Sequence, residues 1–181
     1  MPRQERIELP ENMLAGRNPI REALRGGLPV EKLLAADGDL SGAAREILAL
    51  AREKGEAPFL VALDGITDPH NLGAIIRSAE CAGAHGVIIP QRRSCGLTPT
   101  VVKAAAGSTA YLMVARVPNL NRTLEELQEK GVWTAAAALE GEDAFTADLS
   151  GPLCLVIGSE GDGISRLTLE KCDRRLTLPM K

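Results

Sequence analysis

Two residues that stand four positions apart, Gly73 and Arg77, could together hold an anion. In a helix, residues i and i+4 are neighbours on one face. A glycine there weakens the helix by about 1 kcal/mol relative to alanine, which suggests that the missing side chain has a use. Clear space above a guanidinium, beside a helix N-terminus, would suit an anion. The alternative, which this stretch leaves open, is a solvated arginine above a glycine near the start of the helix.

An apolar strand leads into that helix through a polar joint. The strand covers residues 59–64, the joint contains Asp68 and Asn71, and the helix is expected to begin near Leu72. One buried stripe recurs at the i, i+3, i+4, i+7 spacing: Leu72, Ile75, Ile76, Ala79 and Gly83. Arg77 lies about 150° from the middle of this stripe, so we expect it to face away from the sheet.

The second candidate site is the loop "GSEGDG", residues 158–163, which follows an apolar strand. Glycines after a strand let backbone amides approach a ligand closely. A P-loop would place Lys and then Ser or Thr after the last glycine, where this chain has Ile164 and Ser165. A Rossmann fingerprint would be G-x-G-x-x-G in an early unit, whereas this loop reads G-x-x-G-x-G near the end of the chain. The alternative is a plain turn with solvated acidic residues.

Composition excludes some kinds of RNA-binding protein. The chain has a net charge of −3, so no global field attracts a polyanion, and a nucleic acid would be held by local patches. Candidate patches are Arg17, Arg21 and Arg25; Arg92 and Arg93; and Lys171, Arg174 and Arg175. Aromatic residues make up only 2% of the chain, too few for a platform on which bases stack.

The four cysteines form no CxxC pair and indicate neither a disulfide framework nor a metal site. Cys81 and Cys154 lie in apolar contexts and are expected as small core residues. No segment approaches the length of a membrane span, and the start of the chain has no apolar leader region. We therefore expect a cytoplasmic protein.

After the opening strand, short apolar strands alternate with helices. The further expected strands cover residues 86–90, 110–117, 132–139 and 152–158, and the further helices cover residues 98–108 and 121–131. This pattern is typical of an α/β fold, a mostly parallel sheet with helices on both faces. One more short strand is indicated by alternating apolar residues in the tail, Leu176, Leu178 and Met180. Gly158 and Leu178 are then expected to be neighbours across two loops.

The first part of the chain has the pattern of a separate small domain. Residues 1–57 contain signals for two helices and one strand, which bury too little surface to be stable alone. We place the domain boundary before Pro58, so that residues 58–181 form the main domain.

Three stretches resemble the SpoU family of RNA ribose 2′-O-methyltransferases, in the SPOUT superfamily. "DPHNLGAIIRSAECAG" resembles the first family motif, "LVIGSEGDGIS" the second and "LTLPM" the start of the third. The likeness is greatest to the branch that methylates a guanosine of bacterial large-subunit ribosomal RNA. "MLAGRNPIREAL" resembles the start of that branch's small α/β RNA-binding domain.

The resemblance implies a fold, a cofactor and roles for individual residues. The fold is a parallel sheet whose C-terminal part is threaded into a trefoil knot, and the cofactor is S-adenosylmethionine. Family members act as homodimers on RNA. Arg77, Asn71 and Glu160 match the family's catalytic positions. The positions that match its cofactor site are Gly158, Gly161, Leu178 and Met180.

The sequence departs from the family at both ends. The family's third motif continues into a helix that completes the knot and the dimer, whereas this sequence stops at Lys181, and the N-terminal domain is shorter than in the family. We expect either a fragment or a sequence that omits segments, and favour omission. In both cases the knot is incomplete in the 181 residues, which are not expected to be active alone.

Three other functions remain open. The same site motifs occur in enzymes that methylate transfer RNA. The truncated tail would also fit a non-catalytic RNA-binding protein of the same fold, whose binding would depend strongly on salt. A nucleotide hydrolase is disfavoured, because the phosphate-binding motif and a metal cluster are both missing and His70 and His85 are isolated.

Overall fold

The computed structural model describes residues 49, 55 and 57–179. The elements expected before residue 49, nearly all of the expected 1–57 domain, and Met180 lie outside the described residues.

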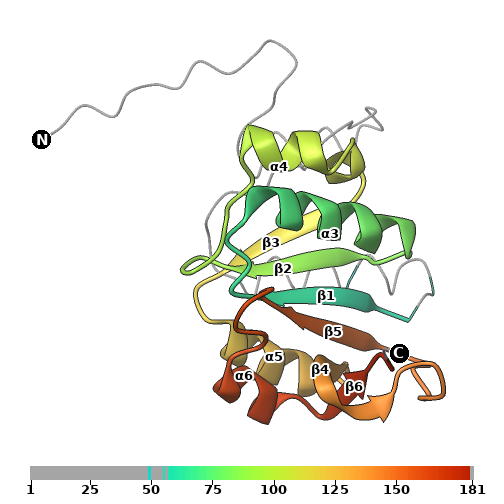
Figure 1. Cartoon of the computed structure of the whole chain (residues 1–181). Helices are drawn as coiled ribbons and strands as arrows, with labels where there is room; N and C mark the ends of the chain where they lie inside the picture. The colour runs from blue at the N-terminus through green and yellow to red at the C-terminus, as the bar shows by residue number, and fades with distance from the viewer. Residues whose placement is uncertain (1–48, 50–54, 56, 180–181) are drawn as a thin grey trace, which may run out of the picture. The chain divides into compact units, whose positions relative to one another are not determined.

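A six-stranded sheet forms the centre of the described structure (Figure 1). Its strands are β1 (Phe59–Asp64), β2 (Gly86–Pro90), β3 (Met113–Val117), β4 (Trp133–Asp143), β5 (Leu153–Gly158) and β6 (Arg174–Thr177). Their order across the sheet is β3-β2-β1-β5-β4-β6, and every pair of neighbours is parallel. The expected α/β fold with a mostly parallel sheet is confirmed.

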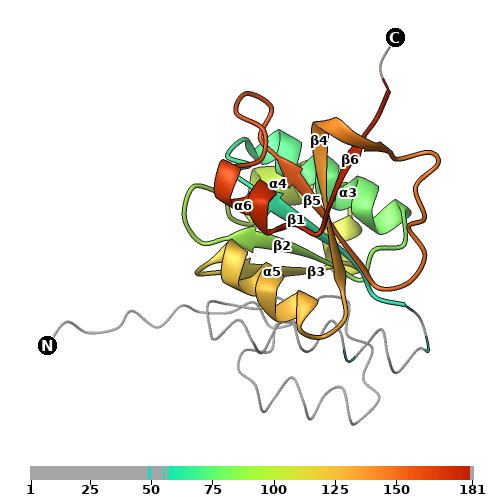
Figure 2. The same cartoon turned by 90° about the horizontal axis from the view of Figure 1, so that it is seen from below.

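Helices cover both faces of the sheet. They are α3 (Pro69–Cys81), α4 (Pro99–Ala104), α5 (Leu120–Gln128) and α6 (Arg166–Lys171), with a short 3-10 turn at Ser108–Ala110. Figures 1 and 2 show α3 and α4 on one face and α5 and α6 on the other. Each face therefore has its own buried core.

Strand β1 contributes to both cores because successive side chains of a strand point to opposite faces. Leu60 and Ala62 belong to the cluster that includes the apolar stripe of α5. Val61 and Leu63 belong to the cluster that includes the stripe of α3. Since every one of these side chains is at most 3% exposed, β1 is buried on both faces, as expected for the centre of a parallel sheet.

Helix α3 begins three residues earlier than the sequence pattern indicated. The Asp68 side chain accepts a hydrogen bond from the backbone N–H of Asn71, at 2.7 Å, and Pro69 occupies the first turn. The helix ends at Cys81, so the expected extension of the buried stripe to Gly83 is wrong. Gly83 is exposed and has φ +77°, a conformation that stops the helix.

Gly73 has a different role from the one its position suggested. It is buried, and a Cβ there would lie 2.5 Å from the Cβ of Ala104 and 2.8 Å from the carbonyl oxygen of Val101. The missing side chain therefore allows α4 to pack closely against α3, and it leaves no space for an anion. The expectation of an anion seat between Gly73 and Arg77 is wrong.

Several element boundaries also differ from the expected ones. Helix α4 has the expected cap, a hydrogen bond from Val101 N–H to the Thr98 hydroxyl, but it ends at Ala104 rather than residue 108. The backbone turns left-handed at Ala106 and Gly107, and β3 starts only at residue 113. Strand β4 runs beyond residue 139 because its end pairs with β6, and helix α6 was not expected at all.

Three further expectations concern single residues. Strand β4 lies between β5 and β6, so Gly158 at the end of β5 and Leu178 after β6 are not on adjacent strands. Cys154 is buried as expected, whereas Cys81 is exposed because it lies on the outer side of the last turn of α3.

No helix in the described ranges is long and apolar enough to cross a membrane.

Candidate functional site

The order of the strands predicts where a ligand binds. From β1 the chain continues outward through β2 to β3, and on the other side of β1 it builds β5, β4 and β6. The direction of winding thus reverses between β1 and β5. In open parallel sheets, the loops after two such strands diverge and leave a crevice at their carboxyl ends.

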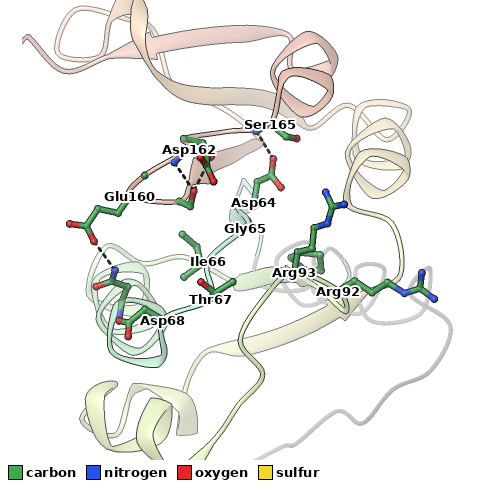
Figure 3. A pocket seen from close by; sticks show the side chains of 15 residues that line it. Asp64, Gly65, Ile66, Thr67, Asp68, Arg92, Arg93, Glu160, Asp162 and Ser165 are labelled. Carbon is green, nitrogen blue, oxygen red and sulfur yellow. Dashed lines mark hydrogen bonds between the residues drawn. The ribbon is translucent and has the colours of Figure 1, made fainter.

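A cleft of about 530 Å³ lies at this crevice (Figure 3). Three loops line it: residues 64–68 after β1, Pro90, Arg92 and Arg93 after β2, and residues 159–163 after β5, with Asn71 and Ser165 completing the wall. Its volume is in the range of small-molecule sites, about 300–1,000 Å³.

The loop after β5 is a tight turn. Ser159 and Gly163 exchange two backbone hydrogen bonds of 3.0 Å, and the Ser159 hydroxyl accepts from Asp162 N–H at 3.2 Å. The turn folds back on Gly158, where a Cβ would lie 2.1 Å from the carbonyl carbon of Gly163. At Gly161 a Cβ would meet no atom within 4 Å. The loop therefore needs a glycine at position 158, and at position 161 the glycine leaves the backbone open to the cleft.

Asp64 ties this loop to the end of β1. The Asp64 carboxylate accepts a hydrogen bond from the backbone N–H of Ser165, at 2.8 Å. Asp64 also lies opposite Gly158 in the register of β1 and β5. The two loops on either side of the crevice are thus held together at their base.

The structure brings two expected site residues into contact. The Asn71 side-chain amide donates a hydrogen bond to the Glu160 carboxylate, at 3.3 Å, although 89 residues separate them in the chain. Asn71 comes from the first turn of α3 and Glu160 from the loop after β5. Both line the cleft and both are exposed, so a ligand can reach them.

The other expected site residues lie elsewhere. Arg77 is exposed on α3, about 9 Å further along the helix axis than Asn71, and it is not part of the cleft wall. Its side chain makes no hydrogen bond or ion pair with any residue in the described ranges. Leu178 is 62% exposed and also outside the wall, and Met180 is outside the described residues.

The charges in the cleft are unevenly placed. Four carboxylates line it, from Asp64, Asp68, Glu160 and Asp162, and two guanidiniums, from Arg92 and Arg93. In Figure 3, Glu160 and Asp68 lie on one side of the cleft and the two arginines on the other. Glu160 and Asp68 thus form an acidic side and the two arginines a basic side, with Asp162 and Asp64 between them. No cluster of side chains with metal-binding character occurs among residues 57–179.

Several wall residues were missed among the expected site residues, and two of them make informative contacts. Asp162 stands in the glycine loop that was recognised as a candidate site, and Ser165 follows that loop by two residues, but neither was singled out. The available signal was the polarity of both residues in and just after that loop. The contact of Ser165 with Asp64 depends on the pairing of β1 with β5, which the sequence pattern does not specify.

The fold and the cleft define a class of protein, a doubly wound α/β domain with a ligand site at its switch point. The model of the SpoU rRNA methylase family matches residues 58–181. This chain therefore belongs to the SpoU rRNA methylase family.

Two curated relatives illustrate the match. The 23S rRNA (guanosine-2′-O-)-methyltransferase RlmB of Ralstonia nicotianae is 52% identical over 124 residues, which are 68% of this chain and 50% of that protein. YacO of Bacillus subtilis, whose name assigns it to the TrmH family of tRNA/rRNA methyltransferases, is 52% identical over 136 residues, 75% of this chain and 55% of that protein. The chain thus spans about half the length of these relatives.

A solved structure shares the fold. The SpoU methyltransferase AviRb of Streptomyces viridochromogenes, in complex with the cofactor AdoMet, matches with a TM-score of 0.64 and 29% identity, over 70% of this chain and 50% of that one.

Proposed function

We propose that this protein transfers a methyl group from S-adenosylmethionine to the ribose 2′-oxygen of a guanosine in ribosomal RNA. The observation that carries the proposal is the family match over residues 58–181, with relatives named as 23S rRNA guanosine-2′-O-methyltransferases at about 50% identity. The geometry supports it because Asn71 and Glu160, the matched motif residues, meet at the cleft of the switch point.

The cleft suits this cofactor in size and charge. S-adenosylmethionine, when bound, supplies a methyl group on a positively charged sulfonium, which an oxygen nucleophile can accept. The four carboxylates of the cleft wall, from Asp64, Asp68, Glu160 and Asp162, favour a ligand that carries positive charge. We assign cofactor binding to Gly158 and Gly161 in the loop after β5. The family motif alone adds Leu178, which is outside the cleft wall, and Met180, which is outside the described residues.

The catalytic roles follow from residue chemistry. A ribose hydroxyl is a poor nucleophile until its proton is being removed, so its position and a nearby proton acceptor matter most. Glu160 and Asn71 can accept from and orient such a hydroxyl. Arginine normally keeps its proton, with a pKa above about 12, so Arg77 is assigned to binding the RNA phosphate and stabilising charge.

Several properties of the whole protein are inferred from the family. We infer that the C-terminal part belongs to a trefoil knot, which is incomplete in these 181 residues, and that two copies form a homodimer with the site near their interface. Residues 1–57 are assigned to a small RNA-binding domain, and the protein is placed in the cytoplasm. The dimer is tested by light scattering on the purified protein, where a monomeric mass would contradict it.

The test of the function starts with the intact mass of the purified protein and a calorimetric titration of S-adenosylmethionine on the same sample. The protein is then incubated with radiolabelled cofactor and either 23S ribosomal RNA or bulk transfer RNA. A 2′-O-methylated nucleotide blocks alkaline cleavage of the bond that follows it, so methylation yields a labelled, alkali-resistant dinucleotide. We expect this product from ribosomal RNA, with guanosine on its 5′ side.

The outcomes separate the alternatives. If label appeared in transfer RNA alone, the substrate would be transfer RNA, and the proposed methyl transfer would stand. A protein that binds RNA but neither binds the cofactor nor transfers label would be a non-catalytic RNA-binding protein, and the proposal would be wrong.

A further inference from the structure

We propose that Arg92 and Arg93 bind the phosphate backbone of the RNA at the basic side of the cleft, and so determine how the substrate enters it. The inference rests on the proposed function, which it deepens by adding a substrate-positioning pair outside the family's matched motif residues. Both arginines come from the loop after β2, which contributes to the cleft wall but contains none of the expected catalytic residues.

The loop holds these two residues in a fixed place. On one side of the pair, Gln91 N–H donates to the carbonyl of Val117, at 2.7 Å, and anchors the loop to the end of β3. On the other side, Cys95 N–H donates to the carbonyl of Ile66, at 2.8 Å, and anchors it to the loop after β1. A segment fixed at both ends presents its side chains with little further loss of backbone entropy on binding.

Arg93 also has an unusual backbone conformation. Its φ is +57°, in the left-handed region that glycine and asparagine occupy far more easily than arginine. Residues in such conformations persist where the surrounding structure enforces them, and they cluster at binding and catalytic sites. Arg93 therefore carries its side chain at a position where glycine would relieve the backbone strain. This indicates that the side chain has a function in binding.

The two guanidiniums are available for a ligand. Both side chains are exposed, and neither forms a hydrogen bond or an ion pair with the part of the chain that the structure describes. Glu160 and Asp68 lie across the cleft, and the nearer Asp64 carboxylate already accepts a hydrogen bond from Ser165 N–H (Figure 3). Arg92 and Arg93 can therefore donate hydrogen bonds to whatever enters between the two sides.

Electrostatics then fixes the orientation of a polyanion. Two unit charges 4 Å apart interact with about 1 kcal/mol in water and more near a protein surface, so Glu160 and Asp68 disfavour a phosphate on the acidic side. On the basic side, arginine can bind a phosphate with two parallel hydrogen bonds. RNA that enters with its backbone along Arg92 and Arg93 places the ribose toward Asn71 and Glu160. Because the whole chain carries −3, the attraction has to come from local patches such as this pair.

The experiment measures RNA affinity against salt concentration. The probe is a fluorescein-labelled RNA hairpin, followed by anisotropy, and the proteins are the wild type and the double variant Arg92→Ala/Arg93→Ala. The control is Lys103→Ala/Lys130→Ala, which removes the same charge from exposed positions outside the cleft. A third variant, Arg93→Gly, removes the side chain and suits φ +57°, so it separates binding from folding.

We expect the cleft variant to bind at least 10-fold more weakly at low salt. The slope of log K against log[salt] should become shallower by about 1.5, the change for two lost phosphate contacts. The control should keep the wild-type slope. Arg93→Gly should weaken RNA binding and keep its melting temperature. S-adenosylmethionine affinity, measured by calorimetry, should be the same in all four proteins.

Two results would overturn the inference. One is an unchanged salt slope in the cleft variant while the wild type binds both RNA and cofactor; the proposed function would then stand without this pair. The other is an equal loss of RNA and cofactor binding in Arg93→Gly, which would make the loop structural. A wild type that binds neither ligand would instead reject the proposed function, and the inference with it.

Discussion

Gly158 and Gly161 stand three residues apart in one loop, and their surroundings give them different tolerances to a side chain. A Cβ at Gly158 would lie 2.1 Å from the backbone of Gly163, whereas at Gly161 it would meet nothing within 4 Å. We predict that Gly158→Ala lowers the free energy of unfolding by about 2–3 kcal/mol, as overpacking does. Gly161→Ala should stay within about 0.5 kcal/mol of the wild type.

Chemical denaturation measures both stabilities, and calorimetry with S-adenosylmethionine shows whether the loop still binds. Gly161→Ala serves as the matched control, because it makes the same chemical change in the same turn. Equal stabilities for the two variants would mean that the turn does not fold back on Gly158 as described.

Arg77 offers a test of a catalytic assignment that does not depend on the cleft wall. It is exposed on α3 and has no partner in the described part of the chain, so its removal should not disturb the fold. We predict that Arg77→Ala reduces methyl transfer by at least 100-fold, because a phosphate and the charge that develops at the reacting centre lose their stabilising partner. Cofactor affinity should stay unchanged.

Lys130→Ala is the control for Arg77→Ala, since it removes an exposed positive charge outside the cleft. Arg77→Lys should recover only part of the activity, because a lysine cannot bind a phosphate with two parallel hydrogen bonds. Full activity in Arg77→Ala would exclude Arg77 from the reaction.

The four cysteines differ in reactivity in a way that burial dictates. Burial raises the pKa of the Cys154 thiol far above its ordinary value, and burial together with the nearby Asp173 carboxylate raises that of Cys172 to about 11. The thiolate is the reactive form. At pH 8 we predict rapid labelling of the exposed Cys81 by a thiol reagent, and labelling of Cys154 only after unfolding. Mass spectrometry of labelled peptides gives both rates; similar rates for Cys81 and Cys154 would contradict the packing of β5.

Helix α3 starts at a cap that can be tested separately from the site it supports. The Asp68 carboxylate accepts from Asn71 N–H at 2.7 Å, so it fixes the first turn and with it the side chain that contacts Glu160. We predict that Asp68→Ala destabilises the protein by about 1 kcal/mol, whereas Asp68→Ser keeps most of the stability because serine is also a good cap.

Asp162→Ala controls for the loss of negative charge in the cleft, because Asp162 is an exposed acid that caps no helix. Its stability, measured by thermal unfolding, should stay close to that of the wild type. If Asp68→Ser were as unstable as Asp68→Ala, the charge rather than the cap would be the source of the effect.

The sequence predicted most elements because their signals are local. The apolar runs of β1, β2 and β5 and the capped start of α4 depend on neighbours in the chain, and the structure confirms them. The role of Gly73 could not be predicted in this way. Its reason is the backbone of α4, which lies about 30 residues further on, and no local pattern describes how closely two helices pack.

The predictions of helix α6 and of the end of α4 were wrong for related reasons. α6 has only six residues and, in the described structure, no side-chain hydrogen bond at its cap, so its signal is weak and packing decides. At the end of α4, the alanines favour continued helix, yet the chain turns left-handed at Ala106 and Gly107.

In the whole molecule, the site exists because two distant strands are neighbours. Asp64 ends β1 and Gly158 ends β5, and their pairing joins the two loops that hold Asn71 and Glu160. Local patterns could predict that both loops bind something, but only the strand order shows that they form one cleft. The family motifs supplied that pairing in advance, because they name residues from both loops together.

The same strand order divides the molecule into two cores that should contribute to stability independently. Ile76 on α3 and Ile88 on β2 are both fully buried, but they belong to the clusters on opposite faces of the sheet. We predict that Ile76→Val and Ile88→Val each lower the free energy of unfolding by about 0.5–1.5 kcal/mol. The loss of stability in the double variant should equal the sum of the two single losses within about 0.5 kcal/mol, because the two side chains pack in different clusters on opposite faces of the sheet.

Urea unfolding of the two single variants, the double variant and the wild type completes the cycle. The reference is the pair Ile76→Val and Ile89→Val, which makes the same chemical changes within one cluster and can therefore couple through shared neighbours. All variants should unfold in one transition, since β1 lies in both cores and joins them into one cooperative unit. A coupling above about 1 kcal/mol for the pair on opposite faces would mean that strain in one core passes through the sheet into the other. In that case a change at the α5 face would also reach the cleft, where the loops after β1 and β5 meet.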